Sequence, residues 1–252
     1  MMFEVSDTAY DNFMGRYSER LAPLFADFAG AKAEQKILDV GAGTGALTAE
    51  LLRRGAEVAG ADPSPTFVGA LGRRFPDADM RAATAEDLPW PDESFDAALS
   101  QLVLTFMNDA PAGVAEMRRV VRPGGVVAAC MWDRQGMDML AAVHRTQVAL
   151  AATGTTEART LYRSRDEIES LFAGAGFSDM QTELLEVERE YAAFDELWGT
   201  IVDGAGPAGA WVKTLDDVTR AKARDEMHRQ IGEPSGAFTL YGRAWATCAT
   251  RA

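Results

Sequence analysis

Residues 36–55 read KILDVGAGTGALTAELLRRG, and this stretch decides the fold. The letters KILDV predict a buried strand, because a short apolar run carries a single acid, Asp39. Gly41, Gly43 and Gly45 follow and predict a tight turn, in which the backbone bends sharply and leaves room for a ligand. The leucines after the turn recur at helical spacing. The stretch therefore predicts a strand, a glycine turn and an amphipathic helix.

The same pattern repeats along the next eighty residues or so. A second strand is expected to end at Asp62, and a helix is expected to follow. If Asp62 caps that helix, Pro63 is one of its early residues. Further strands are expected in MRAATAEDLPW, FDAALSQLVL and VVAACMW, with a helix in APAGVAEMRRVV before the last of these. Strands that alternate with helices predict a parallel sheet covered by helices on both faces.

Beyond Asp133 the rhythm changes. Helices are expected over about 137–153 and in SRDEIESLFAGAGF, and strands in SDMQTELLEVEREY and GAFTLYGRAWATCAT. Between the last two strands, residues 192–234 read as helices and loops, which we interpret as a lid. We expect one domain over 1–252: a helical arm or flap over 1–35, a cofactor-binding core over 36–135, and the remaining sheet with substrate-side insertions over 136–252.

Composition narrows the classes of function. The 252 residues are 47% hydrophobic and carry a net charge of -13, which argues against a nucleic-acid or anionic-membrane surface. Two cysteines, Cys130 and Cys248, make no disulfide framework and lack metal-ligand spacing, so no metal is expected. We see no signal peptide and no membrane-spanning run, and we therefore expect a cytoplasmic protein.

Asp62 has two interpretations at this stage. At the carboxyl end of a parallel strand, a carboxylate can accept hydrogen bonds from two ribose hydroxyls. The alternative is that Asp62 caps the following helix. Gly41, Gly43 and Ala46 also satisfy the dinucleotide fingerprint, with Asp62 about 20 residues on, so an NAD(P)-dependent oxidoreductase is a rival interpretation.

Four ordered motifs distinguish these possibilities. LDVGAGTG, ADPSP, AEDLPWPDESFDAALS and EMRRVVRPGG stand in this order, and together they resemble the class I S-adenosylmethionine-dependent methyltransferases. Within that class, the chain is similar to the ubiquinone and menaquinone biosynthesis methyltransferases. A dehydrogenase accounts for the first two motifs only. The resemblance implies an α/β, Rossmann-like, doubly wound and mostly parallel seven-stranded sheet, with an antiparallel last strand and helical insertions in the C-terminal half.

The resemblance also implies a site for S-adenosyl-L-methionine, with S-adenosyl-L-homocysteine as product. Asp39 and the backbone of the turn would hold the amino acid end, Asp62 the ribose hydroxyls, and Gln101 would face the methionine portion. The family commonly has an acid where Thr84 stands, which leaves the adenine contact to Glu86 or to the backbone. The cofactor-binding residues implied in the core are Asp39, Gly41, Ala42, Gly43, Asp62, Pro63, Ser64, Ala85, Glu86 and Gln101.

The N-terminal YDNFMGRYS resembles a segment of the same family. Our hypothesis is that Tyr10, Met14 and Arg16 form a flap over the cofactor, with Arg16 near its carboxylate. Packing of the N-terminal arm alone would explain the same residues.

Methyl transfer needs alignment and a dry pocket more than a covalent nucleophile, although a base helps when the acceptor must lose a proton. His144, in an apolar helix, is the candidate base, whereas His228 is expected on a solvated helix face. We expect a small-molecule acceptor and a monomer or homodimer. The alternatives are an oxidoreductase and a cofactor-binding protein without catalytic activity.

Overall fold

The computed structural model describes residues 15–150, 161–203 and 207–252. The chain divides into two compact units. The sheet unit comprises Ser18–Arg134, Thr160–Leu185 and Arg243–Ala252, and the helical unit comprises Met1–Tyr17, Gln135–Arg159 and Glu186–Gly242. The end of the helix expected over about 137–153 lies partly outside the described residues.

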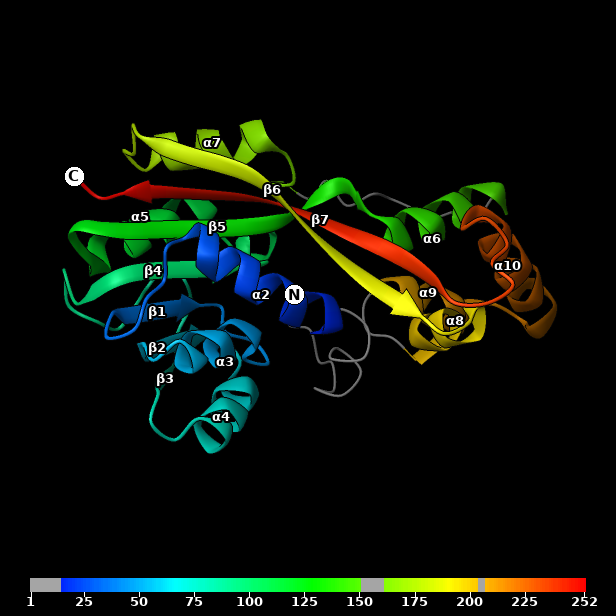
Figure 1. Ribbon diagram of the computed structural model, residues 1–252, viewed down its shortest axis with the longest axis horizontal. Coiled ribbons are helices and arrows are strands. Elements are labelled where there is room, and N and C mark those ends of the chain that lie inside the picture. The colour runs from blue at the N-terminus through cyan, green and yellow to red at the C-terminus, as the bar shows by residue number, and fades with distance from the viewer. Residues whose placement is uncertain (1–14, 151–160, 204–206) are drawn as a thin grey trace. The chain divides into compact units, whose positions relative to one another are not determined.

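One seven-stranded sheet organises the fold, in the order β3-β2-β1-β4-β5-β7-β6 (Figure 1). The strands are β1 (Lys36–Val40), β2 (Glu57–Asp62), β3 (Asp79–Ala82), β4 (Phe95–Gln101), β5 (Val121–Met137), β6 (Met180–Tyr191) and β7 (Phe238–Thr250). The order reverses between β1 and β4, which is where an open α/β sheet forms its ligand crevice.

The first five strands are parallel, as the sequence predicts. In the central pair, Leu38 of β1 is opposite Ala59 of β2 and Ala98 of β4. The last strand runs the other way: its end meets the beginning of β5, where the Arg251 amide donates to the Gly125 carbonyl at 2.8 Å. Because β1 is covered on both faces, its residues form a nearly continuous apolar run.

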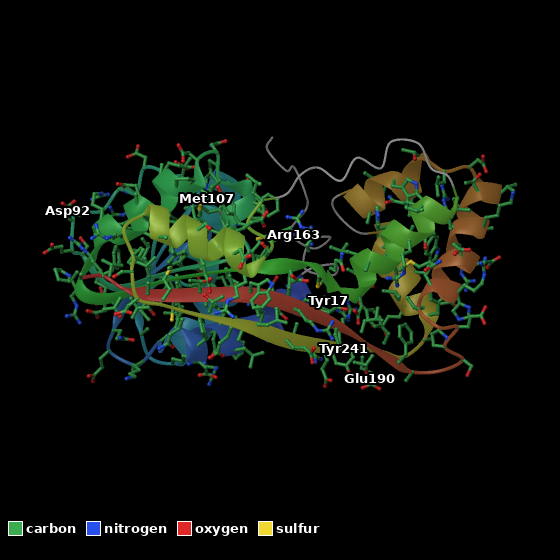
Figure 2. The ribbon with its side chains drawn as sticks, turned by 90° about the horizontal axis from the view of Figure 1, so that it is seen from above. Tyr17, Asp92, Met107, Arg163, Glu190 and Tyr241 are labelled. Atoms are coloured by element: carbon green, nitrogen blue, oxygen red, sulfur yellow. The ribbon has the colours of Figure 1, made fainter. Side chains whose placement is uncertain are left out.

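Helices cover both faces of the sheet unit. They are α2 (Arg16–Phe28), α3 (Ala46–Arg53), α4 (Pro65–Arg74), α5 (Ala110–Val120) and α7 (Arg165–Gly174), with a short 3-10 turn η2 (Leu104–Phe106) after β4. Figure 2 shows the blue α2 and the yellow-green α7 on opposite faces of the strands. The layered α/β fold that the sequence predicts is confirmed.

The core of the sheet unit lies between the strands and the helices α5 and α7. Leu38, Val114 and Phe172 are each fully buried in it. Trp90 meets the ring of Phe95 edge to face, with the ring centroids 5.6 Å apart. This packing supports the carboxyl ends of β1, β2 and β4, where Asp39, Asp62 and Gln101 lie.

The helical unit contains α6 (Asp138–Ala149), α8 (Phe194–Asp203), α9 (Pro207–Thr214) and α10 (Asp217–Gln230). Phe194, Leu197 and Ile201 of α8 are buried, at the spacing of one helix face. The expectation of helices within 192–234 is met, whereas the lid function of this segment stays a prediction.

Two details differ from the sequence-based expectations. Helix α4 begins at Pro65, so Pro63 is not an early helix residue. Its N-cap is Ser64, whose hydroxyl accepts from the Phe67 amide at 3.4 Å, and therefore Asp62 does not cap this helix.

Candidate functional site

The glycine turn between β1 and α3 is held against β2 by its own backbone. The amides of Gly41 and Ala42 donate to the Ala61 carbonyl, at 2.8 and 3.0 Å. Gly41, Gly43 and Gly45 have φ values of 79°, 54° and 89°, a region that favours glycine. Three left-handed residues in five let the chain leave β1, cross the end of β2 and enter α3.

Two of these glycines are also required by close packing. A Cβ on Gly41 would lie 2.5 Å from Cγ2 of Val103, and one on Gly45 would lie 2.5 Å from Cδ2 of Leu71. Among the described residues, a Cβ on Gly43 would come no nearer than 3.9 Å to another group. The turn is therefore covered by Val103 at its first glycine and open at its second.

Asp62 joins the turn to the next helix. Its Oδ2 accepts from the Gly43 amide at 2.9 Å and its Oδ1 accepts from the Ser64 amide at 2.8 Å. Burial raises the pKa of Asp62, although these two amides oppose the shift. A carboxylate oxygen has more than one acceptor direction, so the side chain retains capacity for donors of a ligand.

Asp39 lies one strand away and is almost fully buried, with 1% of its surface exposed. Thr48 of α3 donates to its Oδ2 at 2.7 Å. Burial, together with the nearby charge of Asp62, raises the pKa of Asp39 to about 7, against the opposing hydrogen bond from Thr48. A cationic ligand would favour the ionised form of this group.

Gln101 ends β4 and carries an unsatisfied acceptor. Its Nε2 donates to the Ser18 carbonyl at 3.0 Å, while its buried Oε1 has no hydrogen-bond partner among the described residues. The next residue, Leu102, has a φ of 66°, an uncommon conformation for a residue with a side chain. Such strain is often found at binding sites.

The residues implied for adenine recognition are engaged in local structure. Oε1 of Glu86 accepts from the Asp109 amide at 2.9 Å, just before α5. Burial alone would raise the pKa of Glu86, but this amide and its neighbours hold it below the usual range. Ala85 is buried in the core, and Pro63 is exposed beside Asp62. Backbone contacts around Ala85 thus remain the better prediction for adenine than the Glu86 side chain.

Of the three residues in the flap hypothesis, Tyr10 and Met14 lie outside the described residues. Arg16 belongs to the helical unit, where its Nη1 is 3.5 Å from Oε1 of Glu196. Its role beside the cofactor stays a prediction.

Both histidines belong to the helical unit. His144, the candidate base, is exposed on α6. His228 is not on a solvated face as expected: its ring lies 4.6 Å from that of Phe194, and its Nε2 is 3.0 Å from the Pro234 carbonyl. Across the described ranges, no group of three or more metal-binding side chains occurs.

Sequence reasoning missed three residues that build the site. Thr48 binds Asp39, Val103 covers Gly41, and the Ser18 carbonyl holds Gln101. Of the three, only Thr48 could have been found from the sequence. It falls in the first turn of the expected helix, and that turn must face the end of β1. The other two contacts join segments far apart in the chain, and no local pattern predicts them.

The match to a known family covers the strands and turns just described. Residues 38–129 match the family described as "Methyltransferase domain". The matched segment runs from β1 into β5 and contains Asp39, the glycine turn, Asp62 and Gln101.

Relatives with curated names match over parts of their length. The chain is 41% identical over 99 residues to a demethylmenaquinone methyltransferase of Beutenbergia cavernae, over 39% of this chain and 41% of that protein. It is 32% identical over 169 residues to a malonyl-[acyl-carrier protein] O-methyltransferase of Halorhodospira halophila, over 65% of this chain and 53% of that protein. The matches thus span about two fifths to a half of these relatives.

Solved structures show the fold. A protein of Anaeromyxobacter dehalogenans, whose assignment as a type II methyltransferase is itself provisional, has a TM-score of 0.66 and 23% identity, over 92% of this chain and 95% of that one. The [4+2]-cyclase SpnF has a TM-score of 0.56 and 19% identity, over 98% of this chain and 85% of that one. One scaffold thus carries differently named proteins, so the activity must be argued from the site.

The sheet order and the glycine turn are those of a Rossmann-like α/β fold. Within it, residues 38–129 match a methyltransferase domain and are similar to demethylmenaquinone methyltransferases. The resemblance seen in the sequence is confirmed.

Proposed function

We propose that this protein is an enzyme that transfers a methyl group from S-adenosyl-L-methionine to a small-molecule acceptor. The observation that carries the proposal is the bond from the amide of Gly43 to Asp62, with Asp39 and the unsatisfied Oε1 of Gln101 on the next two strands of the sheet. All of them lie within the segment that matches the methyltransferase domain. The family match alone would leave the ligand unspecified.

The described residues fit this cofactor in charge and in hydrogen bonding. The amino acid end is cationic at its amino group, and the buried Oε1 of Gln101 and the carboxyl of Asp39 are acceptors suited to it. Asp62 offers its carboxylate to the ribose hydroxyls, and its bonds to Gly43 and Ser64 fix its orientation. The absence of a side chain on Gly43 leaves space above the turn.

When bound, the cofactor supplies an electrophilic methyl group on a sulfonium, which an acceptor displaces in line. The chain's own part is to bind, orient and exclude water. Asp39 and Asp62 hold the ligand from two adjacent strands, and Gln101 fixes it from a third. Val103 packs on Gly41, so the segment that follows β4 lies against the glycine turn.

Thermal unfolding with S-adenosyl-L-homocysteine and with NAD tests the proposal, since a ligand that binds only the folded state raises the midpoint. We expect stabilisation by S-adenosyl-L-homocysteine and none by NAD. Stabilisation by NAD alone would favour the oxidoreductase. A protein that binds S-adenosyl-L-homocysteine but methylates no candidate acceptor would fit the inactive cofactor-binding alternative.

The acceptor is proposed at the level of a small molecule. One relative is named for demethylmenaquinone and another for a malonyl group on acyl carrier protein, so the two differ in the accepting atom and substrate class. Both are starting substrates for an assay with radiolabelled S-adenosyl-L-methionine. His144→Ala tests the candidate base: because the imidazole is exposed on α6, we expect less than about a twofold loss of rate, against the roughly 100-fold or greater loss expected for a base.

A further inference from the structure

Arg189 is a buried cation on β6 with a donor left over. Its side chain is 3% exposed, and its buried Nη1 has no hydrogen-bond partner within the described ranges. Along the end of β6, Val187, Arg189 and Tyr191 are buried in alternation. A buried guanidinium with an unsatisfied N–H is costly, because the group has lost its water without full replacement.

The two acidic residues next to Arg189 on β6 do not balance its charge. Glu188 and Glu190 are exposed, and the alternation of a strand directs them to the opposite face. Glu190 is labelled at the rim in Figure 2. The charge of Arg189 therefore has to be balanced from other elements of the helical unit.

Glu196 of α8 supplies that balance in part. Its Oε1 is 3.4 Å from Nη2 of Arg189 and 3.5 Å from Nη1 of Arg16. Its Oε2 also accepts from the Ala192 amide at 2.9 Å. One carboxylate, 37% exposed, thus serves two guanidinium groups, and Nη1 of Arg189 is not among its partners.

Two tyrosines complete the cluster. The hydroxyls of Tyr17 and Tyr191 are 3.2 Å apart, and the Arg189 guanidinium lies 4.2 Å from the centroid of the Tyr191 ring. Burial raises the pKa of both tyrosines, so both hydroxyls stay neutral and keep their protons. The Tyr191 hydroxyl donates to Sδ of Met139 at 3.9 Å, so the Tyr17 hydroxyl is the donor of the pair. Nη1 of Arg189 is therefore the donor of this cluster that remains for an anion.

We propose that Arg189, with the hydroxyls of Tyr17 and Tyr191 beside it, binds the carboxylate of a small-molecule ligand. A planar carboxylate takes two N–H donors of a guanidinium side by side, and the aromatic walls exclude water that would screen the pair. Phe238, stacked on Tyr191 at 5.4 Å, extends the apolar wall. The proposal is independent of the proposed function, because all of these residues belong to the helical unit.

A fluorine NMR titration of the intact protein with trifluoroacetate tests this directly. We expect a saturable shift of the ligand signal that acetate reverses and acetamide, of nearly the same shape, does not. Backbone amide shifts should change around residues 187–196. A buried water on Nη1 is the competing explanation, and it predicts no saturable shift. That result, or amide changes confined to other residues, would overturn the proposal.

Substitutions of Arg189 test whether its positive charge binds trifluoroacetate. Arg189→Met should weaken trifluoroacetate binding at least about tenfold, as expected when a charged hydrogen bond is removed, and Arg189→Lys should retain part of it. The matched control is Arg220→Met in the same unit, since the Nε of Arg220 is also buried without a partner while its side chain is 39% exposed. Equal weakening by the two Met variants would contradict the assignment. If Arg189→Met does not fold, the Lys variant and the wild-type competition still decide.

Discussion

Two buried carboxylates on neighbouring strands are the costliest residues of the sheet unit. Asp39 and Asp62 are 1% and 7% exposed, and burial raises the pKa of each, because an ionised carboxylate is costly away from water. Hydrogen bonds from Thr48, Gly43 and Ser64 offset part of that cost. A fold that retains such groups usually does so for a ligand.

Asp62→Asn should weaken both folding and cofactor binding. An amide offers one acceptor where two backbone amides need one each, so one N–H loses its partner. We expect a loss of about 1–3 kcal/mol in the free energy of unfolding, and weaker binding of S-adenosyl-L-homocysteine by calorimetry. The exposed Asp77→Asn is the control and should change neither. Unchanged affinity in Asp62→Asn would remove Asp62 from the ligand site.

Asp39 makes stability depend on pH. Its pKa is about 7 in the folded chain and near 3.8 in the unfolded one, so between these values the folded state binds more protons. The free energy of unfolding should therefore fall as pH rises through this window. Asp39→Asn removes the titration and still accepts from Thr48.

The measurement is urea unfolding of wild type and Asp39→Asn from about pH 5 to about pH 8. Relative to wild type, the variant should gain stability steadily with pH and level off above the folded pKa. A difference between the two proteins that stays constant over this range would show that Asp39 does not titrate there.

At the scale of elements, the close packing of α4 against the start of α3 depends on the absence of a side chain at Gly45. Gly45 is the N-cap of α3, and Leu71 of α4 occupies the place of its Cβ. The sequence explains the glycine through turn geometry. The structure adds that the side chains of Leu71 and Phe75 would have to shift if residue 45 had a Cβ.

Gly45→Ala should therefore destabilise the protein, by about 1–3 kcal/mol for the positive φ alone, with the clash at Leu71 adding to it. Gly72→Ala in α4 is the matched control. A Cβ there meets nothing within 4 Å, so the substitution should stabilise by roughly 0.5–1 kcal/mol through helix propensity. Chemical unfolding of both variants checks the pair, and equal effects would refute this account of Gly45.

At the scale of the whole molecule, the two compact units allow ligand effects to be mapped. Hydrogen exchange with and without S-adenosyl-L-homocysteine should show slower exchange in the glycine turn and around Asp62. Protection confined to the helical unit would contradict the cofactor site. Among the described residues, no helix is both long and apolar enough to cross a membrane.

Much of the fold was predictable, because alternating apolar runs and glycine turns report local structure directly. The strand ending at Asp62 agrees with expectation. The alternative in which Asp62 caps α4 is wrong, since Ser64 is the N-cap. The prediction for His228 was wrong, because the charged residues around it in the sequence do not indicate that its ring is half-buried against Phe194.

The sequence by itself determined the parallel sheet, the glycine turn and the resemblance to methyltransferases, because each depends on residues close together in the chain. Only the tertiary structure decided that Val103 covers Gly41, that Gln101 keeps an unsatisfied oxygen, and that Arg189 is buried with a spare donor. Those facts depend on which distant segments exclude water from a polar group. Burial of that kind is a property of packing, and no local pattern of residues encodes it.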